Sequence, residues 1–213
     1  DSYTSGSPDG SGYNIEVVFK GSWTADLQQC FIDAADLISS FILGDVADVF
    51  FRGKIIDDVR IEAKLSDIDG AGGILGQAGP TVYRTADYLP AAGVMEFDVA
   101  DAETYDAAGF FNDIVFHEMM HVIGFGTMWD LMGLVAEGPD GTLEFTGQNA
   151  AIAFAAEFGA GPVSIETEGG SGTAGGHWNE GGNDGFAFDN EIMTGYIDTG
   201  ADGNYLSNTT IAA

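Results

Sequence analysis

The chain has 213 residues, and its 34 acidic and 6 basic side chains give a formal net charge of −28. Such a charge repels phosphate backbones and anionic lipid surfaces, so nucleic acid and membrane partners are not expected. No apolar run approaches the ~18 residues that a membrane span needs. Hydrophobic residues make up 45% of the chain, enough for one sizeable core or two subdomains that share one.

The acidic composition favours a solvated surface suited to secretion into saline surroundings, and it leaves room for calcium. Three clusters place oxygen ligands on turns: "DIDG" at 67–70, "GNDG" at 182–185 and "DTGADGN" at 198–204. None has the full spacing of a helix-loop-helix calcium site, so structural Ca²⁺ is expected without an assigned position. The single cysteine, Cys30, excludes an intrachain disulfide and fits a buried helix position.

The N-terminal part alternates strands and helices. After a loose Ser/Gly/Asp-rich segment at 1–12, the patterns predict a strand at 13–19, a helix at 24–42 that Gly44 ends, a strand at 57–65, a glycine-rich loop leading into a short strand that ends near 84, and a strand at 93–100. Apolar residues at helical spacing predict a second helix from about 106 to 123, with Gly124 as its natural end.

Beyond Gly124 the chain is rich in turns and glycines. A helix is expected at 146–159, and the C-terminal "NTTIAA" is typical of the start of a final helix. We therefore expect one catalytic domain in three parts: a loose segment at 1–12, an N-terminal subdomain at 13–125 and a C-terminal subdomain at 126–213.

The stretch "HEMMHVIGF" at 117–125 carries the strongest chemical signal. On a helix, His117 and His121 lie one turn apart on one face, where both reach a single metal ion, and Glu118 lies beside it. A zinc ion with three protein ligands keeps a position for water, and a neighbouring carboxylate can accept the proton of that water during attack on a carbonyl carbon. Glu118 is the obvious general base.

The third ligand is open from the residues alone. A downstream acid would be Glu137 or Glu144, which follow His121 by 16 and 23 residues, and the other candidate is the one remaining histidine, His177. Gly124 allows the chain to turn back beneath the metal, and "EIMTGY" follows His177 closely.

These motifs resemble the metzincin metallopeptidases, whose zinc helix ends at a glycine and whose site rests on a methionine-containing turn. In most of that clan a histidine lies three residues after the glycine, where this chain has Thr127. The leishmanolysin-like branch instead separates the two by a long insertion. His177, 53 residues after Gly124, fits that branch, as do "GGHW", "NEIMTG" and "LSNTTIAA".

The resemblance implies zinc ligands at His117, His121 and His177, Glu118 as general base, and Met193 as the structural residue of the turn. It assigns Tyr196 no catalytic role, because the family's tyrosine position is Gly195 here. Trp129 and Trp178 are expected to be packing residues that could border a substrate pocket.

The resemblance also implies an α+β fold. Its N-terminal lobe would hold a twisted mixed sheet and two long helices, and its irregular C-terminal lobe the third histidine and the methionine turn. An edge strand near Gly93–Asp98 would pair with substrate, which makes Gly93, Val94, Met95 and Glu96 substrate-binding candidates.

The expected function is a secreted, monomeric zinc endopeptidase that acts on proteins or peptides through a zinc-bound water. The lack of disulfides and the acidic composition suggest a simple microbial, marine or halophilic member of the family. Two alternatives remain: a zinc peptidase that uses Glu144 as third ligand, and a zinc-stabilised binding or adhesion domain that cleaves nothing.

Overall fold

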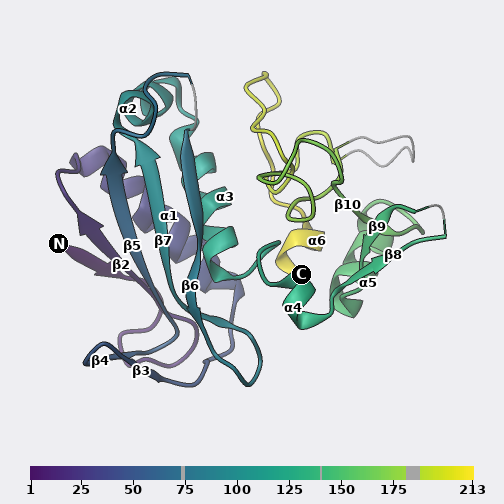
Figure 1. Cartoon of the computed structure of the whole chain (residues 1–213), viewed down its shortest axis with the longest axis horizontal. Coiled ribbons are helices and arrows are strands. Elements are labelled where there is room, and N and C mark those ends of the chain that lie inside the picture. Colours follow the sequence, from purple (N-terminus) through teal and green to yellow (C-terminus); the bar gives the residue numbers. More distant parts are fainter. Residues whose placement is uncertain (73–74, 140, 181–187) are drawn as a thin grey trace. The chain divides into compact units, whose positions relative to one another are not determined.

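The computed structural model describes residues 1–72, 75–139, 141–180 and 188–213. These residues are mixed α+β and fall into two compact units, Asp1–Gly124 and Phe125–Ala213 (Figure 1). None of the described helices combines the length and the apolar character that crossing a bilayer requires.

The first unit is built on a five-stranded mixed sheet. Its strand order is β1 (Ser2–Thr4), β2 (Ile15–Lys20), β5 (Val59–Ser66), β7 (Pro90–Asp98) and β6 (Gly76–Tyr83). The three central strands are parallel, and each outer strand is antiparallel to its neighbour. β1 corrects the expectation of a loose N-terminal segment, because Ser2 to Thr4 pair with β2.

Two helices cover one face of this sheet. α1 (Ala25–Phe41) and α3 (Phe111–Ile123) pack against each other, and α3 also packs on β6 and β7 (Figure 1). The core between helices and sheet centres on Phe31, which makes edge-to-face contacts with Phe19, Phe97 and Phe111. Such aromatic pairs add about 0.5–1.5 kcal/mol each beyond their buried area.

Capping residues explain where the helices of the first unit begin and end. α1 starts as predicted, because Thr24 Oγ1 accepts a hydrogen bond from Leu27 N at 3.2 Å. It ends at Ile42 and not at Gly44. The single helix expected from 106 to 123 is wrong: α2 (Val99–Ala108) stops at Gly109, whose φ of 82° ends the helix, and α3 begins afresh at Phe111.

A short hairpin projects from the first unit and was not predicted. β3 (Val49–Phe51) and β4 (Lys54–Ile56) pair through a tight turn at Arg52 and Gly53, both with positive φ. Two strands of three residues carry too little alternation for a sequence pattern to reveal them.

The second unit has less regular structure. It contains α4 (Trp129–Met132), α5 (Gln148–Glu157), α6 (Asn208–Ile211) and a three-stranded antiparallel sheet of β8 (Val135–Glu137), β9 (Leu143–Phe145) and β10 (Val163–Ile165). The helix expected at 146–159 is confirmed as α5, and the C-terminal helix is confirmed as α6.

Candidate functional site

The two motif histidines project from the last two turns of α3. His117 Nε2 and His121 Nε2 lie 3.0 Å apart, and both side chains are buried. Two nitrogens bound to one zinc ion at 2.0–2.1 Å with a tetrahedral angle are about 3.3 Å apart. The pair therefore has close to the spacing that a shared metal ion requires, and it follows from the four-residue separation on a helix.

Glu118 follows His117 on the same helix and is partly buried. Its burial raises the pKa of the carboxyl to about 7, because the charged form loses water that the protein does not replace. α3 ends directly after the motif: Gly124, with φ of 120°, caps it by donating its N–H to the His121 carbonyl oxygen at 3.3 Å.

Gly93 allows α3 to lie close to the sheet. A Cβ at this position would lie 2.4 Å from Val122 Cγ1 of α3 and 2.7 Å from the Gly79 carbonyl oxygen of β6. Both distances are far below any normal contact, so only glycine fits between helix and neighbouring strand.

The expected edge strand is wrong. β7, which contains Gly93, Val94, Met95 and Glu96, is an interior strand whose main-chain groups pair with β5 on one side and β6 on the other. These residues therefore have no free backbone edge to offer a substrate. The strand at this end of the sheet is β6, which is antiparallel to β7, pairs with no further described strand and packs beside α3.

His177 belongs to the second unit and is also buried. Its Nδ1 lies 2.8 Å from the Thr173 carbonyl oxygen. A carbonyl can only accept, so Nδ1 carries the proton and Nε2 of the neutral ring carries the lone pair that a metal needs. Burial lowers the pKa of His177, which favours this neutral form.

The backbone next to His177 is held against the first residues of the second unit. A Cβ at Gly126 would lie 2.1 Å from the Gly176 carbonyl oxygen, so these two backbones are in direct contact. Trp178 is fully buried, stacks on Trp129 at 4.9 Å and meets Phe125 edge-on at 5.0 Å. Trp129 and Trp178 are thus packing residues, and they fix the position of His177 relative to the segment that follows Gly124.

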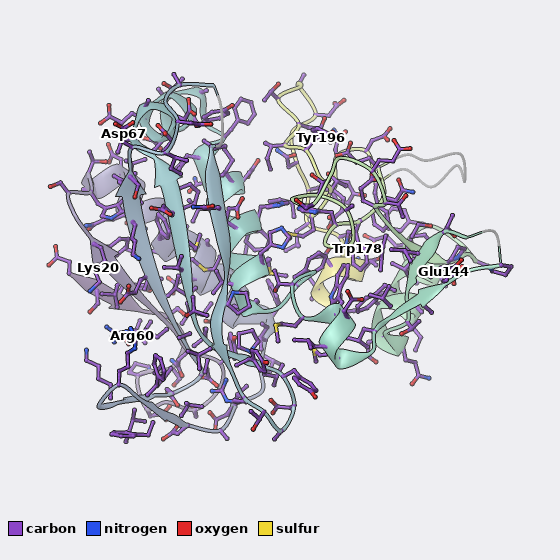
Figure 2. The ribbon with its side chains drawn as sticks, in the orientation of Figure 1. Lys20, Arg60, Asp67, Glu144, Trp178 and Tyr196 are labelled. Atoms are coloured by element: carbon purple, nitrogen blue, oxygen red, sulfur yellow. The ribbon has the colours of Figure 1, made fainter. Side chains whose placement is uncertain are left out.

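Met193 lies in a tight turn beside His177 within the second unit. Its carbonyl oxygen accepts a hydrogen bond from Trp178 N at 3.0 Å, and Thr194 N donates to the Glu191 carbonyl oxygen at 3.2 Å to close the turn. Met193 is fully buried, whereas Tyr196, beyond the turn, is exposed (Figure 2).

Glu191 organises this turn and was missed by sequence reasoning. Its fully buried carboxylate accepts hydrogen bonds from Met193 N at 2.6 Å, from Ser207 N and Oγ at 3.1 and 2.8 Å, and from the Thr210 hydroxyl. Burial raises the pKa of Glu191, while these donors lower it. An acid directly before the "IMTG" turn was the only available signal, and nothing in the sequence links it to Ser207.

The alternative acidic ligands lie in the sheet of the second unit. Glu144 is on the central strand β9, and its carboxylate adjoins Gly138 (Figure 2). Glu137 is exposed on β8.

The calcium clusters gain no site in the described residues. Neither 67–70 nor 198–204 gathers three ligand side chains there, and "GNDG" at 182–185 lies outside the described residues. The acidic group that the described residues do form is Asp45, Asp57 and Asp58.

Together the three histidines are a set of buried donors that could hold a metal ion, and the residues do not specify which ion. No model of a known protein family matches the chain. No curated protein matches it either. The function therefore has to be argued from these residues and their chemistry.

Proposed function

We propose that this protein is a secreted zinc endopeptidase of the metzincin type, with His117, His121 and His177 as zinc ligands and Glu118 as general base. The observation that carries the proposal is the geometry of α3. It directs two buried imidazole nitrogens to within 3.0 Å of each other, with a carboxyl group on the adjacent residue. Two buried histidines with only a packing role would each need a hydrogen-bond partner, and nothing would require their Nε2 atoms to lie close together.

Chain connectivity supports His177 as the third ligand. Gly126, which contacts the backbone of Gly176, comes only five residues after His121. Five residues span at most about 18 Å when fully extended. The covalent connection between His121 and the residue that contacts the His177 segment is therefore short, and Gly124 gives it a turn.

The donor chemistry fits zinc. All three ligands are imidazoles, which suit Zn²⁺ and leave a further position open in catalytic sites. The fixed tautomer of His177, set by the Thr173 carbonyl, is the arrangement that metal-binding histidines usually show. A zinc ion held there would act as a Lewis acid toward a carbonyl group and would lower the pKa of a coordinated water.

The protein residues would supply positioning and proton transfer. Glu118 would accept a proton from the attacking water and later donate it to the departing amine. β6 would bind the substrate as an added antiparallel strand, because its outer edge is unpaired in the described residues and it lies beside α3. This replaces the 93–96 segment as the expected substrate strand.

Glu118→Gln is the direct test. We expect the variant to retain its fold and its zinc, and to lose cleavage of a quenched peptide by on the order of 10²–10⁴ in kcat/KM. Glu103→Gln, at an exposed position of α2, makes the same chemical change and should keep full activity. Full activity of Glu118→Gln in material free of contaminating peptidase would overturn the mechanism.

Zinc content distinguishes His177 from Glu144 as the third ligand. Zinc content measured by mass spectrometry should fall in His177→Ala and stay at one ion per chain in Glu144→Ala. The opposite result would assign Glu144. A zinc-loaded wild-type protein that cleaves no peptide after removal of any pro-segment would instead support a binding domain.

A further inference from the structure

The basic residues of this chain gather on one surface. Of the 6 in the sequence, Arg52, Lys54, Arg60 and Lys64 line one hollow of about 400 Å³ in the first unit, together with a single carboxylate, Glu62. In a chain with 34 acidic residues, this is a local reversal of the charge.

The hollow lies on the sheet face that the helices leave uncovered. Along β5 the residues alternate, so that Val59, Ile61 and Ala63 are buried beneath the helices while Arg60, Glu62 and Lys64 point to the other side. The β3–β4 hairpin forms the remaining wall. Lys20 and Arg60 are labelled in Figure 2 on β2 and β5 of this same face.

The acids of the face do not neutralise all of these cations. Glu16 pairs with Arg60 at 2.6 Å, and Glu62 lies 3.8–3.9 Å from both Lys64 and Lys20. Within the described residues, Arg52 and Lys54 make no ion pair. Arg52 lies in the hairpin turn with φ of 48°, and its guanidinium carbon lies 5.1 Å from the centre of the Phe51 ring, a cation–π contact.

The spacing of the cations indicates an extended ligand. Arg60 and Lys64 are four residues apart on one strand, so their Cα atoms are about 13 Å apart, a span that suits an extended ligand better than a single phosphate or sulfate. Apolar side chains line the same hollow: Phe51 and Ile56 from the hairpin, and Val82 and Val94 from β6 and β7. A polysaccharide offers few groups for such apolar walls, whereas a peptide carries carboxylates and apolar side chains in turn.

We propose that this cationic hollow binds an extended acidic peptide segment of a partner protein, with its carboxylates on Arg52, Lys54, Arg60 and Lys64. The hollow lies wholly within the first unit and shares no residue with the metal ligands. The proposal does not rest on the proposed peptidase activity, although Thr81 and Val82 of β6, the strand proposed to bind substrate, also line the hollow.

Fluorescence anisotropy with a labelled twelve-residue peptide of three Glu-Leu-Glu-Ala repeats tests the proposal. The full chain carries Glu118→Gln, so that the probe stays intact whether or not the protein is a peptidase. We expect saturable binding that 0.5 M NaCl abolishes and that a Gln-for-Glu version of the peptide does not show.

Charge reversal at matched positions locates the site. Lys54→Glu and Lys64→Glu should each weaken binding by about tenfold, whereas Lys20→Glu, the same change on the same face but outside the hollow, should weaken it less than about threefold. Circular dichroism confirms that each variant is folded, which is expected because Lys54 is exposed and makes no ion pair among the described residues. An equal loss with Lys20→Glu, no binding of the acidic peptide, or tighter binding of a sulfated oligosaccharide would overturn the proposal.

Discussion

Gly126→Ala tests how the third histidine is held. The added Cβ would lie 2.1 Å from the Gly176 carbonyl oxygen and 2.7 Å from its Cα, where real contacts are at least 3.0 Å. The backbone at Gly126 or at Gly176, directly before the proposed zinc ligand His177, must therefore move by about 1 Å, whereas metal–ligand distances usually stay within about 0.2 Å of their ideal values. We expect zinc affinity to fall at least about tenfold.

The same substitution should also cost stability. Alanine at a positive φ loses about 1–2 kcal/mol, and the forced backbone shift adds about 1–3 kcal/mol to the loss of unfolding free energy. Gly133→Ala is the matched control, because Gly133 has φ of 68° against 71° for Gly126 and no atom within 4 Å of the added Cβ. Chelator competition and urea unfolding followed by tryptophan fluorescence measure the two quantities. If both variants lose the same stability and the same zinc affinity, the reasoning about Gly176 fails.

Three further predictions concern the first unit. Gly93→Ala should lower the unfolding free energy by about 1–3 kcal/mol, because the added Cβ would clash with Val122. Gly79→Ala, whose added Cβ would have no atom within 4 Å, should change it by less than about 1 kcal/mol. Urea unfolding measures both losses, and equal losses would refute the close approach of α3. Arg84→Lys should lower the unfolding free energy by about 2–4 kcal/mol. The Arg84 guanidinium donates hydrogen bonds to four carbonyl oxygens, and an ammonium group cannot reach all four; they belong to Ala47, Asp57, Asp58 and Pro90. A melting temperature within about 2 °C of wild type would contradict this. Backbone N–H donors from Ala100 and from Ile68 to Gly70 hold the pKa of Asp98 below its usual range. The contribution of Asp98 to the unfolding free energy is therefore present above about pH 4 and is lost as the pH falls through the lowered pKa. The difference in stability between wild type and Asp98→Asn should shrink on acidification, and a constant difference from pH 7 to pH 2.5 would refute this.

Much of the candidate site could be predicted from the sequence because its signals are local. The His117 and His121 pair depends only on a helix and a four-residue spacing, and Gly124 ends that helix with a φ of 120°, which glycine adopts with little strain. Helices that repeat apolar residues at helical spacing over many residues, or that begin at a capping residue, are predictable for the same reason; α1 with Thr24 is an example.

Errors arose where long-range pairing overrides the local pattern. Strand 90–98 alternates no differently from an edge strand, yet β6 folds back antiparallel to it and takes the edge, because the chain reverses at 84–89. The sequence likewise carries no sign that Glu191 would accept hydrogen bonds from Ser207 and Thr210. Such contacts join segments that are far apart along the chain, so they produce no periodic pattern in the sequence.

The sequence by itself determined the net charge of −28, the helix with its two histidines, and the three imidazoles that are available to a metal. Tertiary structure decided which outer strand of the sheet has an unpaired edge among the described residues, which carbonyl sets the tautomer of His177, and that scattered lysines and arginines share one sheet face. The physical reason is that composition and helical spacing can be read from single residues and their near neighbours. Strand order, and the meeting of side chains from distant segments at one place, exist only once those segments have paired.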